Sequence, residues 1–116
     1  MIDEKLKNQI LNIIFKFINE EECMIFLFGS FKKGRVNQSS DIDIGIICNK
    51  KLDPILVQRI NHELNEKVWT LREVDVIDFN SISDKVFLNS ALNEIEIWYI
   101  GKKLKTKKRL EEVLLR

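Results

Sequence analysis

The chain has 116 residues, of which 45% are hydrophobic, and this suffices for the core of a single small domain. Its 19 basic and 18 acidic residues leave a formal net charge of +1, so the composition does not require a nucleic-acid partner. Charged residues interrupt the N-terminus where a signal peptide would need an apolar run, and no apolar stretch approaches the roughly 18 residues of a membrane helix. We therefore expect a cytoplasmic protein without a membrane partner.

The positive charge is concentrated at the C-terminus. Residues 102–116 carry seven basic and two acidic side chains, a net charge of +5, which leaves −4 for residues 1–101. We expect this basic segment to contain a charged terminal helix over residues 104–116. Its basic side chains would then be either a solvated helix face or a segment that docks a partner or attracts RNA.

The first part of the chain predicts a helix and two strands. Apolar residues recur at helical spacing from Ile2 to Ile18, which favours an amphipathic helix. Residues 23–28 form a continuous apolar run that ends at Gly29, as in a central strand covered on both faces. Residues 30–34 resemble a cap, a single helical turn and a glycine stop. Residues 41–48 alternate: one face carries Ile42, Ile44, Ile46 and Cys48, and the other carries Asp41, Asp43, Gly45 and Ile47.

The second part continues the alternation of helices and strands. Asp53-Pro54 predicts the start of a helix that extends to about Val68, and residues 73–79 predict a third strand. Ser81 and Asp84 resemble a capping pair for a helix that extends to about Leu92. Residues 95–100 predict a fourth strand. This order indicates a mixed α/β layer fold in one domain over residues 1–116.

The cysteines, the histidine and the large aromatic residues predict no site of their own. Cys23 and Cys48 lie in apolar runs without metal-ligand spacing, so we expect buried reduced thiols and no zinc site. His62 is predicted on the polar side of its helix. We expect three large aromatic residues in the core or at an interface, namely Trp69, Trp98 and Tyr99.

Asp41 and Asp43 are the first candidates for chemistry. Strands disfavour Asp, and two like charges on one strand face repel each other, so their place beside an isoleucine-rich face needs an explanation. Carboxylates at i and i+2 project in the same direction and can reach one or two Mg²⁺ ions, which also bind substrate phosphates. The pair therefore predicts a metal site that acts on a triphosphate.

Gly29-Ser30 predicts the complementary phosphate site. Glycine lets the backbone approach a phosphate closely, and the amides of the following helical turn point towards an anion. Ser30 is an N-cap in either case and is a candidate phosphate contact as well. The nearby cations are candidates to neutralise phosphate oxygens, namely Lys32, Lys33 and Arg35.

Asp75 is the candidate third carboxylate, because it interrupts an apolar strand where a solvated side chain would be unusual. If its strand neighbours that of Asp43, Asp75 would bind a second metal ion and accept the proton of an acceptor hydroxyl. Asp78, at the end of the same strand, is the alternative.

Together these residues resemble the signature of the polymerase-beta-type nucleotidyltransferase superfamily, and most closely its minimal, MNT-type branch. That signature is Gly-Ser, a basic residue and Gly, then Ser-Asp-Ile-Asp, followed by a Val-Asp-aliphatic-aliphatic-Asp strand. The matching segments are Gly29-Ser30, Lys33-Gly34, Ser40-Asp41-Ile42-Asp43 and Val74–Asp78. The resemblance implies that Asp41, Asp43 and Asp75 are catalytic and bind metal. It also implies that Gly29, Ser30, Lys33, Arg35 and Ser40 bind the nucleotide.

The resemblance further implies a polymerase-beta-type fold, two Mg²⁺ ions and ATP as the nucleotide donor. Minimal members are commonly paired with a HEPN-family toxin, so it implies transfer of AMP to a tyrosine of such a partner, in a hetero-oligomer. Three alternatives stay open: an antitoxin that acts by binding alone, a nucleotidyltransferase for RNA or a small molecule, and a homodimer.

Overall fold

The computed structural model describes residues 2–29 and 41–105. The order of its elements is α1 (Glu4–Phe15), η1 (Glu20–Glu22), β1 (Cys23–Phe28), β2 (Ile42–Cys48), α2 (Pro54–Lys67), β3 (Val74–Asp78), η2 (Phe79–Ser81), α3 (Lys85–Leu92) and β4 (Glu96–Ile100). All the strands and helices predicted within these ranges are present, with boundaries shifted by a few residues. The predictions for residues 30–40 and 106–116 fall outside the described residues.

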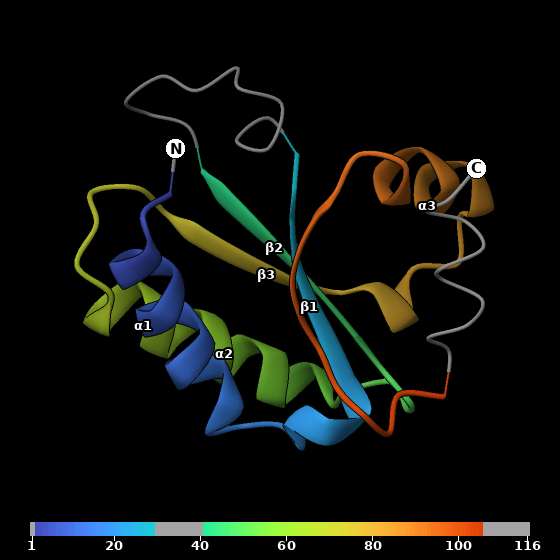
Figure 1. Cartoon of the computed structure of the whole chain (residues 1–116), viewed down its shortest axis with the longest axis horizontal. Coiled ribbons are helices and arrows are strands. Elements are labelled where there is room, and N and C mark those ends of the chain that lie inside the picture. Colours follow the sequence, from blue (N-terminus) through green and yellow to red (C-terminus); the bar gives the residue numbers. More distant parts are fainter. Residues whose placement is uncertain (1, 30–40, 106–116) are drawn as a thin grey trace.

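The strands form one mixed sheet in the order β3-β2-β1-β4 (Figure 1). β1 pairs antiparallel with both β2 and β4, whereas β2 and β3 are parallel and are joined through α2. α1 and α2 cover one face of the sheet, and α3 lies on the other side. The mixed α/β fold in a single small domain is therefore confirmed.

Alternation along the strands divides the apolar side chains between two cores. The core beneath α1 and α2 contains Ile25, Leu27, Ile42, Ile44 and Ile46 of the strands, together with the fully buried Ile14 and Ile60 of the helices. Met24, Phe26 and Phe28 point to the opposite face and pack with Phe79 and Leu92. β1 is buried along its whole length because it has a core on each side, as its continuous apolar sequence predicted.

Each of the described α-helices starts after an aspartate whose side chain accepts hydrogen bonds from the first turn. Asp3 caps α1, Asp53 caps α2 with Pro54 in the first turn, and Asp84 caps α3 through the amides of Val86 and Phe87. Ser81 does not cap α3 as predicted, because its hydroxyl donates to the carbonyl of Asp78. The helix starts after Asp84, because the side chain of this residue accepts from the amides of the first turn.

Asparagine side chains occupy the outer edge of β3. The amide groups of Asn61 and Asn65, one turn apart on α2, each donate to and accept from the backbone of Val76 and Val74, at distances of 2.6–3.1 Å. Asn80 pairs with the backbone of Cys48 in the same way. These side chains take the place of a further strand, so the edge of β3 is not free to pair with another chain.

The cysteines differ from the prediction of reduced thiols. Cys23 and Cys48 lie directly opposite each other in the β1–β2 register and form a disulfide. One position further along, the amide of Asn49 donates to the carbonyl of Glu22, so Cys23 and Cys48 are a non-hydrogen-bonded pair, in which side chains of antiparallel strands lie closest. The prediction was wrong because it was based on compartment and local sequence, and neither reveals the register.

The role of the asparagines predicts a measurable effect on stability. Asn65→Ala leaves the amide and carbonyl of Val74 without partners, so the free energy of unfolding should fall by about 1–2 kcal/mol in urea titrations followed by circular dichroism. Asn12→Ala, at an exposed position of α1, is the control and should leave stability unchanged or slightly raised through helix propensity. Equal stabilities for the two variants would contradict this role of Asn65.

Candidate active site

The candidate residues lie in one row across the sheet. Phe28 of β1 is opposite Asp43 of β2, and Asp43 is opposite Asp75 of β3. Side chains at paired positions point to the same face, so both carboxylates lie on the face that carries Phe28, away from α1 and α2. The sequence predicted that the strands of Asp43 and Asp75 would have to be neighbours, and they are.

Asp43 has an unfavourable environment for its charge. Partial burial raises the pKa of the Asp43 carboxyl from 3.8 to about 6, and repulsion by Asp75 and then Asp41 adds to this effect. Asp41 and Asp75 are exposed, at the border of the same site. Three carboxylates that repel one another would be stabilised by a cation among them.

Gly29 lies against this carboxylate. Its φ of +80° is in the left-handed region, and a Cβ atom at this position would lie 2.6 Å from Oδ2 of Asp43. The conformation therefore favours glycine, and a side chain here would displace the Asp43 carboxylate. We call Asp41, Asp43 and Asp75 the acidic row. Gly29, directly after β1, thus brings the backbone beside the acidic row, as a phosphate site next to a metal site requires.

The two faces of β3 separate Asp75 from Asp78. Asp78 is 5% exposed and lies on the same face of the strand as Val74 and Val76, opposite to that of Asp75. Its carboxylate accepts hydrogen bonds from the amides of Leu52 and Asn80. Asp78 therefore holds loops in place, and Asp75 is the carboxylate that shares a face with Asp43.

Other predicted residues of the site lie outside the described part of the chain: Ser30, Lys33, Arg35 and Ser40. Within residues 2–29 and 41–105, no group of three His, Cys, Asp or Glu side chains is arranged as a ready metal site. The donors nevertheless fit a hard divalent cation, because they are carboxylate oxygens whose mutual repulsion a Mg²⁺ ion would relieve.

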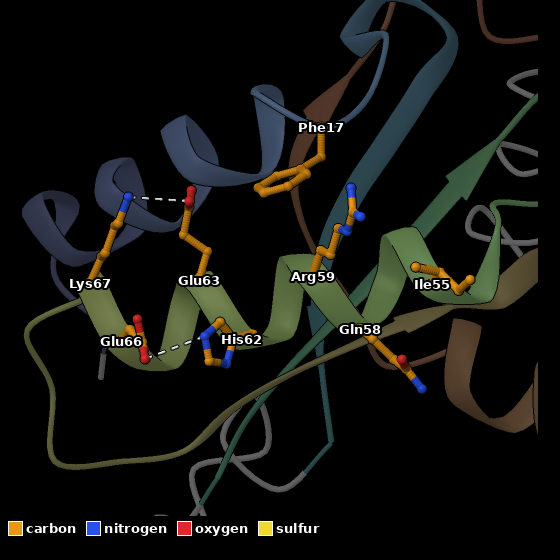
Figure 2. Close-up of a pocket in the computed structure, with 8 residues that line it drawn as sticks. All are labelled: Phe17, Ile55, Gln58, Arg59, His62, Glu63, Glu66 and Lys67. Carbon is orange, nitrogen blue, oxygen red and sulfur yellow. Dashed lines mark hydrogen bonds and ion pairs between the residues drawn. The ribbon is translucent and has the colours of Figure 1, made fainter.

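A cavity of about 610 Å³ lies away from the acidic row (Figure 2). It lies where Phe17 approaches α2, in the layer of helices behind the sheet. Its side chains pair with one another: hydrogen bonds and ion pairs from Lys16 and Lys67 hold the pKa of Glu63 below its usual range, and His62 contacts Glu66. His62 is exposed on the polar side of α2, as predicted, and is not part of the row.

The family model for polymerase beta and nucleotidyltransferases matches residues 8–104. The chain belongs to this family. The matched range includes Gly29, Asp41, Asp43 and Asp75, so the acidic row lies within the nucleotidyltransferase domain. A search of curated proteins finds no match to the chain. Within the described residues, none of the helices has the length and hydrophobicity that a membrane span requires.

Solved structures with a similar fold include toxin–antitoxin complexes. One, a toxin–antitoxin complex with AMP-PNP, is similar with a TM-score of 0.71 at 24% identity, over 94% of this chain and 81% of that chain. Another is a tri-AMPylated HEPN toxin with an MNT antitoxin from Shewanella oneidensis (TM-score 0.68, 22% identity, 98% and 82% of the chains). An MntA–HepT complex is similar with a TM-score of 0.67 at 22% identity, over 97% of this chain and 81% of that chain. At these identities the likeness concerns the fold.

The raised pKa of Asp43 predicts a cost to stability without metal. The folded protein holds this proton more tightly than the unfolded chain does, so stability falls as the pH rises from about 4 to 6 and the full penalty is present above pH 6. In EDTA at pH 7.5, Asp43→Asn should therefore raise the free energy of unfolding by about 1 kcal/mol, an amount reduced for the partial exposure of Asp43.

Thermal unfolding at pH 7.5 and pH 5 measures this effect, and the gain should shrink at pH 5. Glu66→Gln, which removes an exposed carboxylate of α2, is the control and should change little at either pH. Destabilisation by Asp43→Asn at pH 7.5 would show instead that the folded structure depends on this charge.

Proposed function

We propose that this nucleotidyltransferase uses Mg²⁺ to transfer AMP from ATP to a tyrosine of a HEPN-family protein, with which it forms a cytoplasmic antitoxin–toxin pair. The observation that carries the chemistry is the pairing of Asp43 with Asp75 across β2 and β3, beside Gly29. The acceptor and the pairing are supported by the similar structures, one of which holds a tri-AMPylated HEPN toxin with an MNT antitoxin. ATP as donor is supported by the complex with AMP-PNP.

We assign metal binding and phosphate binding to different residues of the site. Asp41, Asp43 and Asp75 would hold two Mg²⁺ ions, which neutralise the charge of the triphosphate. Gly29 allows the backbone to approach the phosphates, and Ser30, Lys33, Arg35 and Ser40 are proposed to bind their oxygens. Asp75 is on the edge strand, so it is the carboxylate that an acceptor reaches from outside the sheet.

The reaction is a displacement at the α-phosphorus. The acceptor oxygen forms a bond to the α-phosphorus, the bond from this phosphorus to the bridging oxygen breaks, and pyrophosphate leaves with the electron pair. The proton of the acceptor hydroxyl passes to Asp75. A protein acceptor fits this small chain, because the partner supplies the second substrate together with its own binding surface.

The surface beside Asp75 supports recognition by side chains. The asparagines of α2 occupy the backbone of β3, so an acceptor is not added as a further strand. Trp69 and Leu71 lie in the connection that leads into β3, and both are almost fully exposed. Trp69 is therefore not a core residue, and it remains a candidate for the interface that the sequence suggested as the alternative.

Transfer of label from α-labelled ATP to a purified HEPN partner tests this function. Asp43→Asn should reduce labelling by about 100-fold or more, because it removes a proposed metal ligand. Asp53→Asn, the same change at the N-cap of α2, keeps the cap and should retain activity. Intact-mass measurement should find one or more added AMP groups on the partner.

The outcomes separate the alternatives. If Asp43→Asn still neutralises the toxin in cells and the partner's mass never changes, the protein acts by binding alone. If label passes to RNA or a small molecule and not to the partner, the acceptor proposed here is wrong.

A further inference from the structure

A second cavity adjoins the acidic row on the side opposite to β3. It has a volume of about 210 Å³ and lies between the end of β1 and α3, lined by Phe28, Gly29, Phe87, Ser90, Ala91 and Glu94. At the volume that water occupies in the liquid, this space equals about seven water molecules, which is enough for a ring system. It is smaller than the roughly 300–1,000 Å³ of sites that enclose a whole ligand. Part of a larger ligand would fit here, with the rest outside.

The position of this cavity relative to Asp43 is set by two contacts. Phe28, in its wall, is the partner of Asp43 in the β1–β2 register, and Gly29, also in its wall, lies against the Asp43 carboxylate. The cavity therefore begins where the proposed metal and phosphate site ends. Along the row, Asp75 lies on the edge strand β3, and the cavity lies beyond Phe28 at the other end of the row.

The wall of the cavity includes a half-exposed aromatic ring. Phe79 contacts three other rings, with centroid distances of 4.8 Å to Phe26, 5.0 Å to Phe28 and 6.3 Å to Phe87. Phe26, Phe28 and Phe79 are buried, whereas Phe87 is 44% exposed. Phe87 is thus supported from behind by Phe79 and retains accessible ring surface at the cavity, as a stacking platform requires.

We propose that this cavity binds the purine base of the nucleotide donor by stacking on Phe87, with the triphosphate directed past Gly29 to the carboxylates. This proposal rests on the nucleotidyl transfer proposed above and adds the orientation of the two substrates in the site. Donor and acceptor enter from opposite ends of the row, the donor's base at α3 and the acceptor at the edge of β3.

Equilibrium binding of ATP and of inorganic tripolyphosphate, both with Mg²⁺, separates the base from the phosphates. Phe87→Ala should weaken ATP binding about tenfold and leave tripolyphosphate binding unchanged. Val86→Ala, a 79% exposed neighbour outside the cavity wall, is the control and should bind both ligands as the unmodified protein does.

A second pair of variants fills the cavity instead of emptying it. Ser90 and Asn89 are both exposed on α3, and only Ser90 lines the cavity, so Ser90→Trp should reduce ATP binding and Asn89→Trp should not. Neither change removes a core side chain, so this pair tests the site even if Phe87→Ala unfolds.

Unchanged ATP binding in Phe87→Ala and Ser90→Trp, together with its loss in Asp43→Asn, would overturn the base site and leave the proposed function standing. Equal loss of tripolyphosphate and ATP binding in either α3 variant would also overturn it, because the effect would not depend on the base. ATP binding that survives in Asp43→Asn would contradict the proposed function itself.

Discussion

The candidate site is built around an unfavourable pairing of two carboxylates on adjacent strands. Asp43 and Asp75 face each other in the parallel β2–β3 register, and burial together with repulsion raises the pKa of Asp43 to about 6. The surrounding structure holds this arrangement in place. α1 and α2 bury the opposite face of β2, and Asn61 and Asn65 pair with the residues on both sides of Asp75. Destabilised charge held by rigid neighbours is typical of a binding site that a cation completes.

The two faces of the sheet have different tasks. Apolar side chains fill the face beneath α1 and α2. The buried carboxylate on this face, Asp78, accepts hydrogen bonds from backbone amides. Among residues 2–29 and 41–105, the aromatic cluster below α3 covers part of the other face, and the end of this face near Gly29 carries the half-buried Asp43 and the exposed Asp75. This division lets one small domain combine a stable core with exposed carboxylates, which suits the proposed acceptor on another molecule.

Much of this could be predicted from local sequence. The continuous apolar run of β1, the alternation of β2 and the aspartate caps of the helices each follow from a few neighbouring residues. Asp43 and Asp75 stand out because strands disfavour aspartate, and Gly29 stands out because glycine at the end of a strand lets the backbone approach a phosphate. What local sequence could not supply was the register. The register places Cys23 opposite Cys48 and Asp43 opposite Asp75. The packing of α3 brings Phe87 into the wall of the cavity that Gly29 also lines, and all these contacts join residues far apart in the chain.

The central claim is that Asp43 and Asp75 share a divalent cation with the triphosphate. Titration with Mn²⁺ in the presence of a non-hydrolysable ATP analogue, followed by the electron paramagnetic resonance signal of the free ion, measures this directly. The account predicts that Asp75→Asn weakens Mn²⁺ binding, whereas Glu73→Gln, an exposed neighbour just before β3, does not. Equal Mn²⁺ affinity in Asp75→Asn and the unmodified protein would contradict it.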